Sequence, residues 1–384
     1  MSSSTGPGRT WPLVGRAAEL DELDDLLSTA AGGRGVTVLL EGEAGVGKSS
    51  LVDALRGSAR LLDVDLVTAR ASAMRSWPFA LLTDALLPHA SRSAGPVEVE
   101  LAEVLDTLSA APTAPSGDVD RATTLFAELI RSRGVERSWA LVLEDVHESD
   151  ARSLEVLLQL AHDGPVHRAL VILTMRPVPY RPELAAVVAA WTRAGARHVE
   201  LRPLSGRATL ELAETLVGGP IGPSLRGTLT TTGGNPRFVA DVVRTARSTG
   251  ALVNTDGVLD CAGVGWLEPL DDVVRHRLDY LGNDVLALLA RASVLGTSFV
   301  MADLSVLADD PVADCWRTLR HALAAGVVRA RGDRLVFGHD LVRGALYNGL
   351  DADDRRALHA TAARVLQEAG APDQIVTAHL ERAR

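Results

Sequence analysis

The chain has 384 residues, 47% of them hydrophobic and 23% charged, and a formal net charge of −10 at pH 7. This length suffices for two or three domains with ample cores, and the composition is ordinary for a globular protein. The negative charge argues against nucleic-acid binding by the chain as a whole, because neutralising phosphates requires a basic face.

Hydropathy and cysteine content indicate a cytoplasmic protein. No apolar run approaches the roughly 18 residues that cross a bilayer, and residues 1–9 are polar and lack a signal segment. The two cysteines, Cys261 and Cys315, are too few and too isolated for a disulfide framework or a zinc site, which fits a reducing compartment.

After an amphipathic helix predicted over residues 17–27, the apolar run Val36–Leu40 leads into the glycine-rich stretch GEAGVGKSS at residues 42–50. A strand, a glycine loop and a helix start in this order form a phosphate cradle. We expect Lys48 to reach the β- and γ-phosphates and Ser49 to complete the shell of a Mg²⁺ ion. Lys48 is the single lysine among 39 lysines and arginines, so a compact charge is kept where arginine's planar fork would not fit.

A second strand is predicted over residues 64–71, and helices with no evident chemistry follow at 78–87, 97–109 and 121–131. The next strong pattern is the buried strand WALVLED, which ends in Glu144 and Asp145. Acids at the carboxyl end of a parallel strand lie where an open α/β sheet binds its ligands. Glu144 would then hold Mg²⁺ and Asp145 would polarise the attacking water. The alternative is that one or both acids cap the following helix.

The strand Ala169–Met175 ends at Arg176, which either contacts the γ-phosphate or pairs with a surface acid, depending on strand order. A short strand at residues 198–201 closes the α/β domain. The rest is mostly helical, and Pro236 stands at a helix start, as proline often does. Two short strands at 327–330 and 334–337, preceded by helices, are typical of a winged helix. We expect boundaries at 1–204 (P-loop domain with an N-terminal helix), 205–268 (helical domain), 269–350 (winged-helix domain) and 351–384 (start of a helical repeat region).

In this order the motifs resemble the nucleotide-binding module of STAND-class signal-transduction ATPases, and in particular the large LuxR-type transcriptional regulators of actinobacteria. The similar segments, besides the phosphate loop, are LVGR at 13–16, LVLEDVHESD at 141–150, TMR at 174–176, GNP at 234–236 and FGHD at 337–340. The resemblance implies an α/β P-loop NTPase, a parallel sheet with helices on both faces, followed by a small helical domain and a winged-helix domain.

The resemblance also implies roles for individual residues toward ATP or ADP and Mg²⁺. The implied catalytic residues are Asp145, Glu144 and Arg176, and the implied metal ligands are Ser49 and Glu144. The implied nucleotide-binding residues are Val14, Gly15 and Arg16 at the adenine, Gly42, Gly45, Val46, Gly47, Lys48, Ser49 and Ser50 at the phosphates, Pro236 in the helical domain, and His339 at the β-phosphate of ADP.

The chain departs from these relatives in two respects. Glu144 stands where many have aspartate, which leaves the shorter acid, Asp145, in the water-activating place; we therefore expect binding to be retained and hydrolysis to be weak. The relatives continue into long helical repeats and a C-terminal helix-turn-helix DNA-binding domain, so we expect such parts beyond this chain.

The leading hypothesis is an ATP/ADP switch with slow ATP hydrolysis, which regulates a transcriptional activator by domain opening and self-association in the ATP state. A constitutive AAA+-like ATPase or remodeller is the first alternative. DNA binding by the winged helix is another, against which the net charge and Asp333 at the wing tip argue; a small-molecule kinase is the weakest, because no acceptor site is legible. In the DNA-binding alternative, the basic patch of the winged helix would consist of Arg317, Arg320, Arg329, Arg331 and Arg334.

Overall fold

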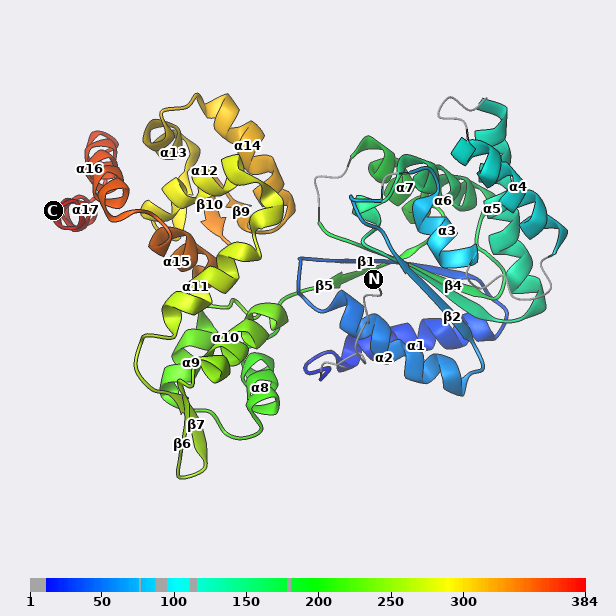
Figure 1. Ribbon diagram of the computed structural model, residues 1–384, viewed down its shortest axis with the longest axis horizontal. Helices are drawn as coiled ribbons and strands as arrows, with labels where there is room; N and C mark the ends of the chain where they lie inside the picture. The colour runs from blue at the N-terminus through cyan, green and yellow to red at the C-terminus, as the bar shows by residue number, and fades with distance from the viewer. Residues whose placement is uncertain (1–11, 76, 88–94, 111–115, 178–180) are drawn as a thin grey trace. The chain divides into compact units, whose positions relative to one another are not determined.

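The computed structural model describes residues 12–75, 77–87, 95–110, 116–177 and 181–384. The chain forms two compact units (Figure 1). The first comprises the chain up to Gly42 together with Gly47–Leu201, and the second comprises Glu43–Val46 and Arg202–Arg384. The tip of the glycine-rich loop is therefore grouped with the second unit, although both of its ends belong to the first.

A parallel five-stranded sheet is the framework of the first unit, as the sequence predicts. Its strand order is β2-β3-β4-β1-β5, and all four pairings are parallel. The strands are β1 (Val36–Gly42), β2 (Asp65–Arg70), β3 (Trp139–Glu144), β4 (Ala169–Met175) and β5 (Arg197–Leu201).

Helices cover both faces of this sheet (Figure 1), which is why β3 and β4 read as unbroken apolar runs. On one side lie α1 (Ala17–Ala31) and α2 (Lys48–Leu61), and on the other lie α3 (Ala80–Leu86), α5 (Ser116–Glu136), α6 (Ala151–Asp163) and α7 (Pro182–Arg193). Alternate strand residues supply the two cores: Leu141 and Leu143 point into the second layer, where Phe79 stacks on Phe126 with ring centroids 5.2 Å apart. Helix α4 (Pro96–Ala110) pairs with α5, and Glu100 accepts a hydrogen bond from Arg121 at 2.7 Å.

The strand order decides what can meet at the carboxyl edge of the sheet. Strand β1 lies between β4 and β5, so the segment after β4 is a direct neighbour of the glycine-rich loop. Strand β2 pairs with β3 in a register that places Arg70 opposite Glu144, the last residue of each strand. An arginine and an acid therefore stand side by side where parallel sheets bind their ligands.

The first part of the second unit contains three helices and a hairpin. The helices are α8 (Gly206–Val217), α9 (Pro223–Thr230) and α10 (Pro236–Ser248). The antiparallel strands β6 (Leu252–Thr255) and β7 (Val258–Cys261) are an addition to the predicted helical pattern. They are joined by Asp256 and Gly257, both with positive φ, which is the conformation that a two-residue hairpin turn requires.

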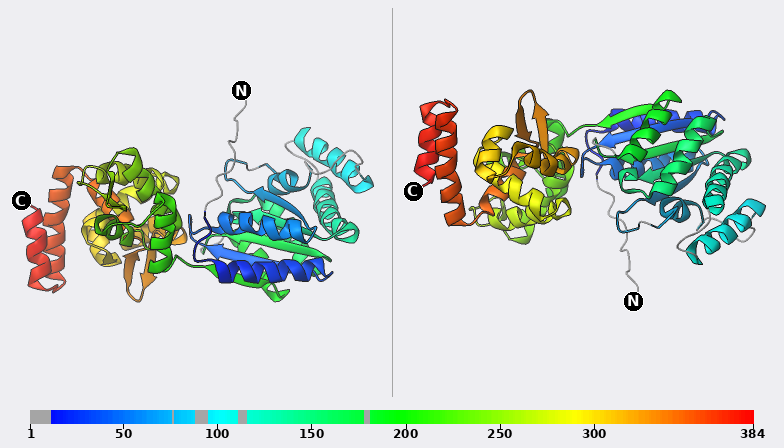
Figure 2. Two further views of the ribbon diagram at one scale, coloured as in Figure 1. Left: turned by 90° about the horizontal axis from the view of Figure 1, so that it is seen from below. Right: turned by 90° about the horizontal axis from the view of Figure 1, so that it is seen from above.

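The remainder of the second unit contains a small antiparallel sheet among helices. Its strand order is β8-β10-β9; two of these strands match the predicted pair at 327–330 and 334–337 to within a residue, and β8 is additional. Figure 2 shows the last two helices, α16 and α17, side by side. The elements are α11 (Leu267–His276), η3 (Asp279–Leu281), α12 (Asn283–Val294), β8 (Ser298–Val300), α13 (Met301–Ala308), α14 (Val312–Ala324), β9 (Val328–Arg331), β10 (Arg334–Phe337), α15 (Asp340–Asn348), α16 (Ala352–Glu368) and α17 (Asp373–Arg382).

Cys261 and Cys315 are both buried free thiols, and burial raises the pKa of Cys261 to about 11. Over the described ranges, no helix combines the length and apolar character needed to cross a membrane.

Candidate functional site

The glycine-rich loop connects β1 to α2 through two left-handed glycines. Gly45 has a φ of 77° and Gly47 a φ of 110°, values that side-chain-bearing residues rarely adopt. A Cβ atom built on Gly47 would meet no atom of the described residues within 4 Å, so the loop is open on that side. Lys48 begins α2, is only 8% exposed, and donates from Nζ to the carbonyl oxygen of Gly42 at 2.6 Å. The ammonium group of Lys48 thus lies at the end of β1, where the loop begins.

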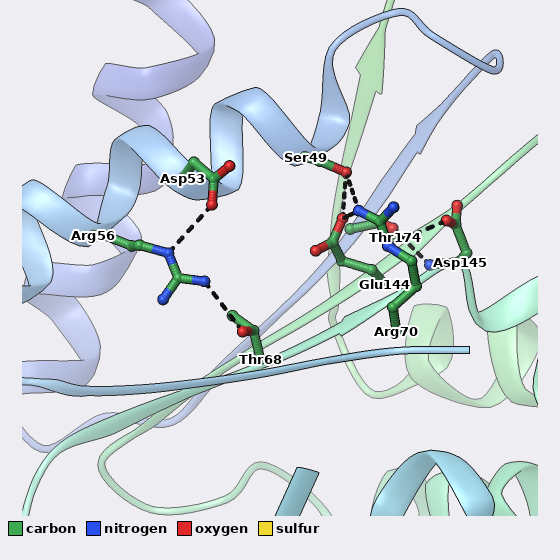
Figure 3. Close-up of polar contacts among 8 residues, drawn as sticks. All are labelled: Ser49, Asp53, Arg56, Thr68, Arg70, Glu144, Asp145 and Thr174. Atoms are coloured by element: carbon green, nitrogen blue, oxygen red, sulfur yellow. Dashed lines mark hydrogen bonds and ion pairs between the residues drawn. The ribbon is translucent and has the colours of Figure 1, made fainter. Parts of the chain in front are cut away.

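Ser49, the second residue of α2, contacts Glu144 at the end of β3, although 95 positions separate them in the chain. The Ser49 hydroxyl donates directly to Glu144 Oε2 (Figure 3). A hydroxyl beside a carboxylate is the donor set with which P-loop proteins hold Mg²⁺, since this ion takes one or two protein oxygens and leaves the rest to water and phosphate. The oxygens present therefore fit the predicted ion.

Arg70 completes this cluster, although no sequence motif points to it. Its Nη2 atom donates to Ser49 Oγ and to Glu144 Oε2, each at 2.7 Å, and its Nε lies 3.8 Å from Asp145 Oδ2 (Figure 3). A positive group is thus already held by the two oxygens predicted to bind the metal. The signal that could have found Arg70 is its place at the end of a strand, but its significance depends on β2 lying next to β3.

Asp145 stands where β3 turns into the short 3₁₀ helix η2 (Val146–Glu148). Its φ is 55°, the left-handed region that aspartate tolerates better than most residues, and its backbone N–H donates to Thr174 Oγ1 at 3.0 Å. The extended conformation of β3 therefore ends at this residue. Helix α6 is capped by Asp150, which accepts from Ser153 N at 2.8 Å, so the capping alternative for Glu144 and Asp145 is not what the structure contains.

His147 lies partly buried in η2 and was not among the predicted site residues. Among the described residues, neither of its ring nitrogens has a hydrogen-bond partner. Burial lowers the pKa of His147 to about 4, and the positive charges of Arg176 and Lys48 act in the same direction. A neutral imidazole beside these two cations is available as a polar partner for a ligand or a water.

Arg176 follows β4, the strand next to β1, and its Nη2 lies 3.8 Å from Glu148 Oε1. Arg176 thus lies at the carboxyl edge of the sheet, next to the strand that leads into the glycine-rich loop. The predicted adenine segment precedes α1: Gly15 has a φ of 67°, and buried Arg16 donates to Glu19 Oε1 at 3.0 Å.

The loop tip has contacts within the second unit. Asn235, the N-cap of α10, donates from Nδ2 to the carbonyl oxygen of Ala44 at 2.9 Å, and Arg237 N donates to that of Gly45 at 3.3 Å. The predicted residue Pro236 sits between these two contacts as the first residue of α10. The neighbour that binds the loop by its side chain is therefore Asn235 and not the proline.

Glu43 is the centre of a second set of loop-tip contacts. His339, the N-cap of α15, is 5% exposed and its Nε2 lies 3.5 Å from Glu43 Oε2; Arg329 Nε donates to Glu43 Oε1 at 2.9 Å. Burial opposes ionisation of Glu43, but hydrogen bonding by His339 and the charge of Arg329 outweigh it, so its pKa lies below the ordinary value. His339 is also fixed edge-on against Phe238, with centroids 5.1 Å apart.

The chain is similar to several known proteins. Residues 12–173 match the family model of the AAA ATPase domain, a segment that includes the glycine-rich loop, Glu144 and Asp145. An uncharacterized protein of Rhizobium meliloti, strain 1021, is 25% identical over 389 aligned positions, which cover 91% of this chain. The chain spans about a third of that relative's length, 36%.

Two solved structures share the fold at low identity. A Walker-type ATPase of Pyrococcus abyssi has a TM-score of 0.56 and 14% identity, and the match covers 88% of this chain and 99% of that one. The ORC2 protein of Aeropyrum pernix, solved in ADPNP–ADP complexes, has a TM-score of 0.51 and 13% identity, with 92% of this chain and 94% of that one covered. The first unit therefore contains an AAA-like P-loop ATPase fold.

Proposed function

We propose that this chain is a nucleotide-controlled switch: it binds ATP and ADP with Mg²⁺, hydrolyses ATP slowly, and regulates a transcriptional activator by opening and self-associating in the ATP state. The observation that carries nucleotide binding is the meeting of Ser49 with Glu144 directly after the glycine-rich loop and Lys48. These residues come from separate elements, and a purely structural role would not require a buried lysine beside a serine–carboxylate pair.

In this proposal each residue has a defined task. Lys48 and the backbone N–H groups of the loop bind the phosphates, and Ser49 with Glu144 holds the metal. Bound Mg²⁺ supplies positive charge that neutralises the β- and γ-phosphate oxygens. Asp145 orients the attacking water and accepts its proton, and Arg176 contacts the γ-phosphate.

Slow hydrolysis is supported by the surroundings of Asp145. Its Oδ2 atom lies 3.8 Å from Nε of Arg70, so the guanidinium competes with the attacking water for the same oxygen. A general base must come within hydrogen-bond reach of the proton that it accepts, so this competition would slow hydrolysis. Binding with little turnover is the behaviour of a switch.

Regulation is supported by the contacts of the loop tip with α10 and α15. The tip of the glycine-rich loop contacts Asn235 and His339, and the same short loop would bind the phosphates of the nucleotide. A change of nucleotide could therefore alter these contacts and so reach the second unit. Transcriptional control rests on the resemblance of the motifs, and a DNA-binding domain would lie outside this chain. Direct DNA binding by β9 and β10 is disfavoured, because Arg329 is paired with Glu43 and Arg334 donates to Ser298 Oγ at 2.6 Å.

The rival function is a constitutive AAA+-like ATPase, and hydrolysis kinetics separate the two. We expect wild-type protein to bind a fluorescent ADP analogue tightly. It should turn over fewer than about one ATP per minute, far below the roughly 1–100 s⁻¹ that is typical of kinases. Lys48→Ala should abolish binding, and Asp145→Asn should bind normally but hydrolyse roughly 10²-fold more slowly. Rapid multiple turnover by the wild type would support the rival, and unchanged binding in Lys48→Ala would refute the site.

A further inference from the structure

Arg70 occupies the place in the cluster that a metal ion would need. One nitrogen, Nη2, donates to both Ser49 Oγ and Glu144 Oε2 at 2.7 Å, while the serine hydroxyl donates its own proton to the same carboxylate oxygen. Nη2 of Arg70 therefore lies within 2.7 Å of both oxygens. A magnesium ion would coordinate the same two oxygens at about 2.0–2.1 Å, and the positive charge of a guanidinium this close would repel it, so the two compete for the site.

Arg70 is held in place by the sheet but can leave the cluster. It is the last residue of β2 and pairs in register with Glu144 on β3, so its Cα is fixed while its long side chain is free to turn. Its side chain is 55% exposed, against 14% for Glu144. An ion pair whose arginine is this exposed contributes little to stability, so a divalent ion can displace the guanidinium.

The released guanidinium has another acid within reach. Nε of Arg70 is already 3.8 Å from Asp145 Oδ2. Movement away from Glu144 would therefore leave the arginine next to the predicted water-activating acid and would not strand the charge.

We propose that Arg70 is a built-in competitor of Mg²⁺: its guanidinium holds Ser49 and Glu144 when no metal is present and is displaced when the metal–nucleotide complex binds. This inference rests on the proposed nucleotide-binding function. It makes Arg70 a positioning residue that keeps the metal ligands ordered and raises the Mg²⁺ concentration needed to load the site. Loading then depends on metal and nucleotide arriving together, because the phosphates supply the remaining attraction.

The test measures how Mg²⁺ alters the affinity for a fluorescent, non-hydrolysable ATP analogue. Arg70→Met removes the charge but retains the apolar stem. We expect it to lower the Mg²⁺ concentration for half-maximal tightening by about three- to tenfold, as loss of a charge-assisted hydrogen bond predicts. In EDTA its affinity should match that of the wild type within about twofold. Arg70→Lys keeps the charge without the planar fork and should give an intermediate value.

Arg56→Met is a matched control. Arg56 also bonds a carboxylate and a hydroxyl, Asp53 Oδ1 at 3.2 Å and Thr68 Oγ1 at 3.1 Å, and its side chain is 40% exposed (Figure 3). Because it touches neither Ser49 nor Glu144 in this network, its removal should leave the Mg²⁺ dependence unchanged.

Two results would overturn the inference, and they are distinguishable. An unchanged or higher Mg²⁺ requirement in both Arg70 variants, with normal wild-type binding, refutes the competition and leaves the proposed function standing. Failure of the wild type to bind the analogue in either Mg²⁺ or EDTA refutes the proposed function and the competition with it. If the thermal melt of Arg70→Met shows that this variant does not fold, the Mg²⁺ requirement of Arg70→Lys alone decides whether Arg70 competes with the metal.

Discussion

Two glycines of the same helix segment show why one position tolerates a side chain and another does not. Gly47 precedes α2 with a φ of 110°, and Gly57 lies inside α2; neither would bring an added Cβ within 4 Å of a described atom. Space is therefore equal at the two positions, and only the backbone conformation differs. The glycine of the phosphate loop is required by its φ and not by crowding.

Gly47→Ala should lower the free energy of unfolding by about 1–2 kcal/mol, which is the cost of a left-handed conformation for an L-residue. Gly57→Ala should raise it by roughly 0.5–1 kcal/mol, because alanine has less conformational entropy to lose. Urea denaturation of the two variants and the wild type measures both changes. Shifts of the same sign would contradict the role assigned to φ at Gly47.

At the scale of elements, Asp260 ties the β6–β7 hairpin to α9. Its Oδ1 accepts from Leu225 N at 2.8 Å and its Oδ2 accepts from Ser224 N at 3.2 Å, so a residue of β7 satisfies N–H groups in the first turn of α9. A carboxylate at a helix N-terminus also complements the helix dipole. The β6–β7 hairpin therefore supplies the N-terminal cap of α9.

Asp260→Ala should destabilise the second unit by about 1–2 kcal/mol, the usual cost of losing a helix cap. Desolvation raises the pKa of Asp260 but its backbone hydrogen bonds outweigh this, so the folded pKa lies below the ordinary value. The stabilisation is thus present above the unfolded pKa and is lost as pH falls through the folded one. Denaturation of wild type and variant at neutral and acidic pH should show their difference shrinking in acid; a constant difference would mean that packing, not the ionised cap, stabilises α9.

Helices α16 and α17 meet through a buried histidine pair. The two Nδ1 atoms of His359 and His379 are 2.9 Å apart, and Tyr347 OH is 2.9 Å from His359 Nε2. One Nδ1 must donate and the other accept, so the contact requires at least one neutral ring. Burial lowers the pKa of His359 to about 4, and the positive charges of His379, Arg382 and Arg355 act in the same direction.

The stability of this helix pair should fall in mild acid. Because the folded pKa of His359 lies below its unfolded value of about 6.5, unfolding takes up a proton between these pH values. The contribution is complete above pH ~6.5 and declines as pH falls toward about 4. His359→Gln, which cannot ionise, should be less stable than the wild type at pH 7.5 but lose less stability between pH 7 and 5 by chemical denaturation. An equal loss in both proteins would remove His359 from the explanation.

For the whole molecule, sequence patterns predicted what depends on near neighbours in the chain. The five sheet strands were predictable because each is a short apolar run bounded by turn residues. The β6–β7 hairpin also has a local sequence signal, the turn dipeptide Asp256-Gly257, although it lies within a mainly helical pattern.

Features that depend on strand order were not predictable from one sequence. Arg70 matters only because β2 pairs with β3, and Arg176 lies near the loop only because β4 is next to β1. Likewise, Glu43 and Asn235 acquire their roles from contacts with residues far along the chain. Sequence spacing fixes local conformation, whereas these contacts follow from how the elements are arranged in three dimensions.

The most direct test of a nucleotide-holding switch is to denature freshly purified wild-type protein and Lys48→Ala and to identify the released nucleotide by ion-exchange chromatography. We predict close to one ADP per wild-type chain and none from the variant, because a slow ATPase that serves as a switch retains its product. Wild-type protein that releases no nucleotide yet hydrolyses ATP rapidly would contradict the switch and indicate a constitutive ATPase.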